Sequence, residues 1–244
     1  MTSPQVSLVV PVHNEAPILE GSIREIHSRL KKLGCSFEIW IAENGSTDDT
    51  AALARELAEE LVEVHTFSIG EPNYGRALRE GIERARGEMV HCDEIDILDV
   101  DFHRRALQML TGEDGGFDMV VGSKVMRGSR DRRPLHRRAA TRVINGMLRV
   151  SLGFKGTDTH GLKAFRRDAL LPLVRACVVD RDMFASELVI RAERAGLRLV
   201  EIPLNLHEKR EPSIRLRKRV PRVLGNIAQL VWVIRVRGEG GEPP

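Results

Sequence analysis

The sequence contains few cysteines, no long apolar run and no leader-like segment. The three cysteines, Cys35, Cys92 and Cys177, are odd in number and form no CxxC pair, which excludes a disulfide framework and a cysteine-ligated zinc site. We expect three buried thiols. No apolar run reaches the roughly 18 residues of a spanning helix, and no basic segment precedes Val6 as in a signal peptide. These absences predict a cytoplasmic protein, at most peripheral at the inner face of a membrane.

An excess of charge of one sign is also lacking, since 38 Lys and Arg residues nearly balance 35 Asp and Glu residues. The 244 residues are 42% hydrophobic and 30% charged, which is typical of a globular protein and excludes a disordered or fibrous one. This length fits one α/β domain or two smaller domains, and no linker divides the chain. We expect a single domain over 1–237 and a flexible tail over 238–244.

Apolar segments of strand length alternate with helical patterns along residues 6–100. Val6–Val10 and Phe37–Ala42 predict buried strands, and between them apolar residues recur at the spacing of one helical face. This alternation predicts an α/β fold with a mostly parallel central sheet flanked by helices. Further strands are predicted at 62–67, 88–92, 117–122 and 197–202, and further helices at 51–61, 77–86, 102–110, 137–152, 166–175, 184–195 and 220–234.

Three carboxylates lie within four residues after the strand that ends at Cys92. In open parallel sheets, ligands bind beyond the carboxyl ends of the strands. Asp93, Glu94 and Asp96 repel one another there unless a cation or substrate donor groups neutralise them. Mg²⁺ or Mn²⁺, held by one or two carboxylates and by substrate phosphates, would do so. A solvated acidic turn is the alternative.

Short sequence blocks follow one another in a fixed order between about residues 6 and 215. They include Val9-Val10-Pro11-Val12-His13-Asn14-Glu15, Glu43-Asn44-Gly45-Ser46-Thr47-Asp48-Asp49-Thr50, Asn73-Tyr74-Gly75-Arg76-Ala77-Leu78, Glu94-Ile95-Asp96, Gly122-Ser123-Lys124, Asp158-Thr159-His160-Gly161-Leu162-Lys163-Ala164-Phe165-Arg166 and Glu201-Ile202-Pro203. In this order they resemble family 2 glycosyltransferases with the GT-A fold, above all the branch of dolichyl-phosphate mannose synthases and polyprenyl-phosphate sugar transferases.

The resemblance implies a GT-A domain whose residues 6–100 bind a nucleotide and whose residues 101–237 bind an acceptor. It implies an inverting, metal-dependent transfer of a sugar from a GDP- or UDP-sugar to a polyprenyl or dolichyl phosphate. Glu94 and Asp96 would hold Mg²⁺ or Mn²⁺ in place of the family's Asp-x-Asp, with Asp96 catalytic. The residues that would meet the donor are Pro11, His13, Glu15, Ala42, Asn44, Asn73, Glu94, Ile95, Asp96 and Arg210.

A basic segment runs from Lys124 to Arg142, with eight Lys or Arg residues and one acid, Asp131. Such a segment can be a solvated surface, a nucleic-acid footprint or a phosphate clamp. It contains no aromatic residue on which bases could stack, so we expect no nucleic acid partner. By the resemblance, Lys124, Arg137 and Arg138 bind the acceptor phosphate.

Asp158 is the second catalytic candidate, because the resemblance places it near the reacting sugar carbon. It would act as the general base toward a hydroxyl acceptor and as a positioning group toward a lipid phosphate, which is already ionised. An N-cap or turn role is the alternative. We expect Glu187 to be structural, and the helix at 220–234 to pack on the core or to lie in a membrane interface.

Three other functions fit parts of the pattern. A glycosyltransferase acting on a soluble hydroxyl acceptor would share the donor site. A nucleotide-sugar binding protein without catalysis would be consistent with Asn44 and Glu94, where the family has aspartates. A nucleotidyltransferase would share the sheet, but no glycine-rich phosphate loop follows the first predicted strand.

Overall fold

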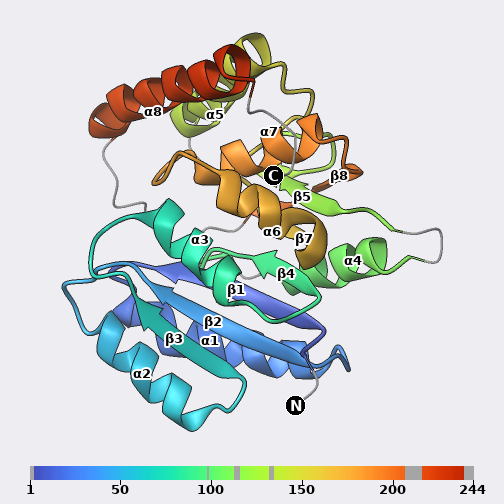
Figure 1. Cartoon of the computed structure of the whole chain (residues 1–244). Helices are drawn as coiled ribbons and strands as arrows, with labels where there is room; N and C mark the ends of the chain where they lie inside the picture. The colour runs from blue at the N-terminus through green and yellow to red at the C-terminus, as the bar shows by residue number, and fades with distance from the viewer. Residues whose placement is uncertain (1–2, 98, 113–115, 132–134, 207–215, 239–244) are drawn as a thin grey trace.

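The computed structural model describes residues 3–97, 99–112, 116–131, 135–206 and 216–238. Within them, seven strands form one sheet in the order β3-β2-β1-β4-β7-β5-β8 (Figure 1). Only β7 runs antiparallel to its neighbours. The mostly parallel sheet confirms the predicted fold class. The strands are β1 (Val6–Val12), β2 (Phe37–Glu43), β3 (Val64–Ser68), β4 (Met89–Cys92), β5 (Met119–Ser123), β7 (Lys163–Arg166) and β8 (Leu199–Pro203).

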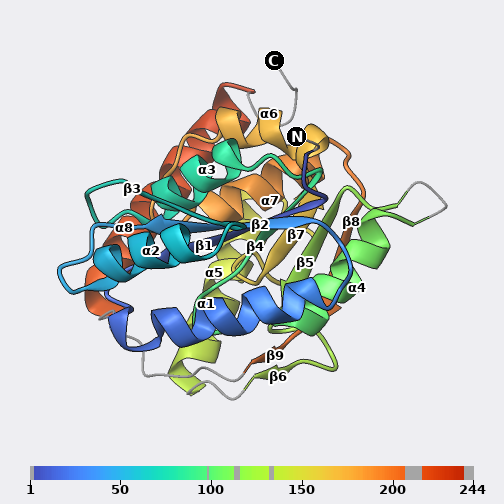
Figure 2. The ribbon, with the colours of Figure 1, turned by 90° about the horizontal axis from the view of Figure 1, so that it is seen from below.

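Helices cover both faces of the sheet, and Figure 2 shows α1 and α3 on opposite sides of the strands. One face is covered by α1 (Ala16–Lys31), α2 (Thr50–Glu60) and α4 (Val100–Leu110), and the other by α3 (Tyr74–Arg84), α6 (Arg167–Ala176) and α7 (Phe184–Arg194). Beyond α7 lie α5 (Leu135–Leu152), α8 (Leu216–Val231) and a π-helix, η1 (Trp232–Val236), while β6 (Arg130–Asp131) and β9 (Asn205–Leu206) form a separate pair.

The alternation of side chains along β1 explains this layering. Val6, Leu8 and Val10 point to one face and pack with residues of α1 such as Ile23, while Val9 points to the other face and packs with α3. The α1 residues follow the helical spacing predicted from the sequence, and Pro17 lies in the first helical turn, where its missing N–H costs no bond.

Two expectations are wrong in detail. Residues 163–166 form β7, although the sequence predicted only a helix that begins at Arg166. Cys92 and Cys177 are buried free thiols, as expected, but Cys35 is half-buried because it lies in the exposed turn after α1. Among the described residues, no helix has both the length and the apolarity to cross a bilayer.

Candidate functional site

The sheet brings the predicted site residues that follow its strands to one edge. The carboxyl ends of β1, β2, β4 and β5 meet there, together with the beginning of the antiparallel β7. Pro11 lies beside Ala42 in neighbouring strands, and Cys92 lies beside Lys163. Loops that are far apart in the sequence therefore face one another across this edge.

The loops after β1 and β2 are joined by hydrogen bonds. His13 Nδ1 lies 2.8 Å from the carbonyl oxygen of Asn44, and Asn14 Oδ1 accepts the N–H of Thr47 at 2.8 Å. Asn14 has a φ of 54°, a left-handed conformation that Asn tolerates. The buried Glu15 donates its N–H to Thr50 Oγ1 at 2.8 Å. His13 and Glu15 thus stand in a loop that is held by hydrogen bonds to the segment after β2.

Asn44 and Asn73 connect β2 to α3. The Asn44 side-chain oxygen accepts the N–H of Asn73, and the Asn73 side-chain oxygen accepts the N–H groups of Arg76 at 3.1 Å and Arg181 at 3.0 Å. Both asparagines are buried. Asn73 therefore caps α3, which begins three residues earlier than predicted, and the Asn44 oxygen is engaged within the protein.

Glu43 is a site residue that the sequence analysis did not single out, although it begins the block that contains Asn44. Its carboxylate accepts the N–H of Ser46 at 2.5 Å and the hydroxyl of Ser68. Burial opposes ionisation, but these hydrogen bonds outweigh it and hold the pKa of Glu43 below its usual value. Gly45 follows with a φ of 64°, and a Cβ there would lie 2.6 Å from the backbone of Glu71. The loop after β2 is thus held by the hydrogen bonds of Glu43 and by the close approach of Gly45 to the backbone of Glu71.

We expect Glu43→Gln to lower the free energy of unfolding at neutral pH by about 2 kcal/mol, because hydrogen bonds to a charged acceptor are lost. The pKa of Glu43 is lower in the folded chain than in the unfolded one. Its contribution is therefore complete above the unfolded value of about 4.3 and disappears as the pH falls through the folded value. Denaturant titrations of both proteins at neutral pH and below about pH 3 should show the difference narrowing in acid. An equal difference at both pH values would contradict the assignment.

The three carboxylates after β4 have different surroundings. Asp93 is 2% exposed, and its oxygens contact His103 Nε2 and the N–H of Glu94, both at 2.7 Å. His103 in turn lies 2.9 Å from the ring nitrogen of His91. Ile95 is buried in the apolar core, so its side chain points away from the surface that Glu94 and Asp96 reach. Asp93 is thus a structural group, and two half-exposed carboxylates, Glu94 and Asp96, are left at the surface.

Glu94 and Asp96 fit a hard divalent cation. The Glu94 side chain is 37% exposed and lies 3.8 Å from the ammonium of Lys124, so a cationic group already balances its charge. In the part of the chain that the structure describes, no group of three or more His, Cys, Asp and Glu residues could hold a metal. Mg²⁺ needs no such group, because it binds through one or two carboxylates and completes its shell with substrate phosphates and water.

Asp158 and Lys124 are in contact beyond the carboxyl end of β5. Asp158 is fully buried, and its oxygens accept the N–H groups of Lys124 at 3.0 Å and His160 at 2.9 Å. Burial alone would raise the pKa of Asp158, but Lys124 and His160 outweigh it and keep the pKa low. Asp158 N–H donates to Glu201 at 3.1 Å. A buried carboxylate that accepts two backbone N–H groups is suited to fixing a loop.

Lys163 is a second site residue that sequence analysis missed. Its ammonium donates to the carbonyl of Gly161 at 2.7 Å, and its side chain is almost fully buried, close enough to Cys92 and Asp158 for their charges to act on it. Burial lowers its pKa to about 8, against the opposing influence of nearby acidic groups. A charged residue inside the apolar run Leu162-Lys163-Ala164-Phe165 is the signal that could have indicated it.

Of the predicted site residues not yet discussed, some lie in the described part of the chain and others do not. Arg138 is half-buried in α5, four residues into the helix. Arg137 belongs to the same helix, but its side chain lies outside the described part of the chain, as does all of Arg210. Glu187 accepts the N–H groups of Val178 and Val179 and binds Arg191 at 2.7 Å, which confirms its structural role.

Comparison with known proteins identifies the family. A profile described as Glycosyl transferase family 2 matches residues 7–171. The chain belongs to glycosyl transferase family 2. It is 32% identical over 241 residues to Glycosyltransferase AglD of Haloferax volcanii, covering 96% of this chain and 38% of that protein. It is 30% identical over 212 residues to the undecaprenyl-phosphate 4-deoxy-4-formamido-L-arabinose transferase of Salmonella newport, covering 85% and 61%. The chain therefore spans less than two thirds of the length of either relative.

Solved structures confirm the GT-A fold of this family 2 chain. Glucosyl-3-phosphoglycerate synthase from Mycobacterium tuberculosis, in complex with Mn²⁺, UDP and glucosyl-3-phosphoglycerate, has a TM-score of 0.63 at 20% identity and covers 99% of this chain and 81% of that one. The mannosyltransferase PcManGT from Pyrobaculum calidifontis, in complex with GDP-Man and Mn²⁺, has a TM-score of 0.59 at 20% identity, covering 100% and 67%.

Proposed function

We propose that this chain is a metal-dependent, inverting glycosyltransferase that moves a sugar from a GDP- or UDP-sugar to a polyprenyl phosphate. The observation that carries the proposal is the link from Glu94 through Lys124 to Asp158 at one edge of the sheet, with Asp96 half-exposed two residues after Glu94. Family membership and the named substrates of relatives support it. Glu94 and Asp96 would hold Mg²⁺ or Mn²⁺, which when bound supplies Lewis-acid stabilisation of the departing diphosphate.

The surroundings of Asp158 favour a phosphate acceptor over a hydroxyl. A hydroxyl needs a general base with free proton-accepting capacity and a pKa near neutrality. Both Asp158 oxygens are engaged by backbone N–H groups, and its pKa is low. An ionised phosphate needs no base, and its charge matches Lys124. Asp158 then positions Lys124, and an acceptor oxygen attacks the anomeric carbon opposite the leaving diphosphate, which inverts its configuration.

A transfer assay with a short-chain prenyl phosphate tests the proposal. The protein is incubated with GDP- and UDP-sugars in turn, with and without Mn²⁺, and the glycosylated lipid is detected by mass spectrometry. We expect the glycosylated prenyl phosphate to form with either the GDP-sugars or the UDP-sugars but not with both, and only when Mn²⁺ is present. Thermal-shift measurements with nucleoside diphosphates should show the same preference, since a bound ligand stabilises the folded state. Nucleotide-dependent stabilisation without any transfer would indicate a binding protein instead.

A further inference from the structure

The segments 135–152 and 216–238 carry ten Lys or Arg residues and no Asp or Glu, in a chain whose charges otherwise nearly balance. These segments form α5, α8 and η1, and α5 packs against α8. In Figure 1 the two helices lie together at the top of the molecule, away from α1 and α2. The charge asymmetry of the sequence is therefore concentrated in one layer of the fold.

The same layer carries exposed apolar side chains. Its inner side packs on the core through residues such as Leu148 and Leu230, which confirms core packing for the C-terminal helix. Its outer side is apolar as well, since Val150 is 84% exposed and Val236 is 70% exposed. Of the eleven exposed large hydrophobic residues in the described part of the chain, six lie here, namely Leu135, Val143, Val150, Leu224, Trp232 and Val236. We call these six residues the α5–α8 face, together with the exposed arginines of these elements whose side chains the structure describes, namely Arg142, Arg149, Arg222, Arg235 and Arg237.

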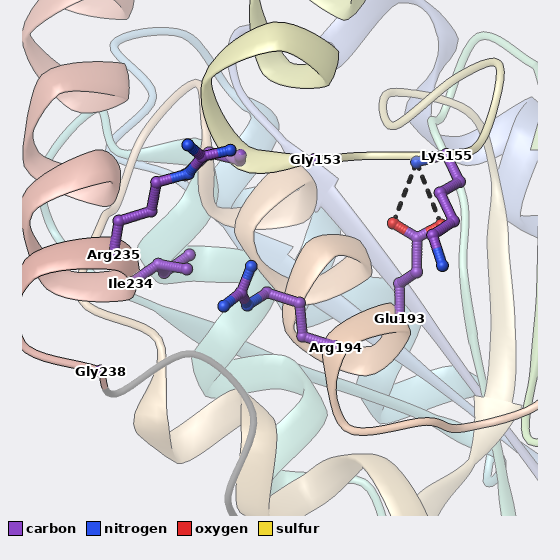
Figure 3. A pocket seen from close by; sticks show the side chains of 8 residues that line it. Gly153, Lys155, Glu193, Arg194, Ile234, Arg235 and Gly238 are labelled. Atoms are coloured by element: carbon purple, nitrogen blue, oxygen red, sulfur yellow. Dashed lines mark hydrogen bonds between the residues drawn. The ribbon is translucent and has the colours of Figure 1, made fainter.

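Two hollows interrupt the α5–α8 face. An apolar groove of about 500 Å³ lies between α5 and α8, with Val143, Met147 and Val150 on one wall and Ile227 on the other. A second pocket, of about 640 Å³, lies where α5 ends beside η1, and Figure 3 shows the guanidinium groups of Arg194 and Arg235 in it. Neither arginine has a carboxylate partner among the described residues, and the acidic residue of this pocket, Glu193, accepts the backbone N–H of Lys155. Basic side chains therefore outnumber acidic ones at this border of the face.

The α5–α8 face adjoins the acceptor end of the candidate site. Asn145 on α5 donates to the carbonyl of Thr157 at 2.8 Å, and Arg149 donates to the carbonyl of Gly156 at 2.9 Å. These carbonyls directly precede Asp158. The helix that carries exposed valines on its outer side thus holds the Asp158 loop on its inner side.

We propose that the α5–α8 face docks on the surface of an anionic phospholipid bilayer. The inference rests on the proposed function, because a prenyl phosphate resides in a bilayer and its phosphate must reach Lys124. Apolar side chains rimmed by arginines match a membrane interface, where apolar groups enter the headgroup region and cations bind lipid phosphates. A second copy of the chain fits poorly, since two such faces would bring only positive charges together. A nucleic acid would leave the exposed valines without a role.

Vesicle co-sedimentation tests the docking surface without donor, metal or acceptor. The full chain is mixed with vesicles of phosphatidylcholine alone and of phosphatidylcholine with phosphatidylglycerol. We expect binding to the anionic vesicles that weakens as salt is raised, because salt screens charges at a surface. No binding to anionic vesicles would overturn the proposal, and so would a dimer in solution whose contact surface is the α5–α8 face.

Paired variants locate the surface. Arg142→Gln with Arg235→Gln should weaken binding to anionic vesicles by about thirtyfold, since each Lys or Arg near such a surface contributes about a fivefold gain. Val150→Ser with Trp232→Ser should weaken it by about tenfold or more, because apolar insertion is lost. Arg55→Gln and Val62→Ser are the matched controls, as both residues are exposed on or beside α2 and should bind like the parent. The assignment of the docking surface would be overturned if the variants and the controls lost vesicle binding equally, or if the variants lost none.

The same variants separate this proposal from the proposed function. With a short-chain prenyl phosphate that dissolves without vesicles, the α5–α8 variants should transfer sugar at the parent rate, and with vesicle-embedded prenyl phosphate they should be slower. Vesicle binding without transfer to either acceptor would leave the docking surface intact and refute the proposed function. Transfer to the soluble acceptor together with no vesicle binding would refute the docking surface alone.

Discussion

Asp96→Ala should lower the rate of sugar transfer by about a thousandfold or more, equivalent to about 4 kcal/mol of transition-state stabilisation. Glu94 and Asp96 are the two half-exposed carboxylates after β4, and together they would hold the divalent cation that meets the diphosphate. Removing Asp96 leaves the developing charge on the leaving group without its counterion. The measurement is nucleoside diphosphate release at saturating donor, over a range of Mn²⁺ concentrations.

The matched control for Asp96→Ala is Glu56→Ala, because Glu56 is an exposed carboxylate on α2 away from the site edge. It should leave transfer unchanged. The Asp96 variant should still unfold in one cooperative thermal transition, since this half-exposed side chain is not part of the apolar core. Chelation of divalent ions should abolish transfer by the parent protein, and added Mn²⁺ should restore it. Parent-like turnover by Asp96→Ala would refute the site assignment.

The first four strands, β1 to β4, could be predicted from the sequence because their apolar residues are the ones that the folded sheet buries. Val6–Val10 and Phe37–Ala42 are apolar because β1 and β2 are buried between helices on both faces. β7 could not be predicted in this way. It has four residues, and its Lys163 is charged at a buried position. The contact with the Gly161 carbonyl and the nearby Asp158, both of which depend on the folded chain, make that charge tolerable.

The acidic segment shows a similar limit. The sequence indicated that Asp93, Glu94 and Asp96 share a strand end, and the sheet confirms that position. It could not indicate which carboxylate turns inward, because the partner of Asp93 is His103 on α4. The position of α4 over β4 therefore determines that Asp93 turns inward. Glu94 and Asp96 stay half-exposed, and this difference between the three carboxylates depends on packing between distant segments.

The closest backbone approach near the site gives the largest expected loss of stability. Gly122, in β5, donates its N–H to the carbonyl of Leu162 at 2.8 Å, and this brings the backbone of Gly161 beside it. A Cβ at position 161 would lie 1.5 Å from the carbonyl oxygen of Gly122. Both partners are backbone, so no side-chain rotation can relieve the overlap. We expect Gly161→Ala to lower the free energy of unfolding by more than about 4 kcal/mol.

Gly21→Ala is the matched control for Gly161→Ala, because a Cβ at position 21 would meet nothing within 4 Å. Gly21 lies inside α1, where alanine should raise stability by about 1 kcal/mol. Denaturant unfolding of the three proteins measures both effects. The change in the free energy of unfolding should have opposite signs in the two variants. The added methyl group collides with the Gly122 carbonyl at position 161, whereas at position 21 it meets no other atom. A parent-like midpoint for Gly161→Ala would mean that the backbone of Gly161 does not pack against the Gly122 carbonyl as described.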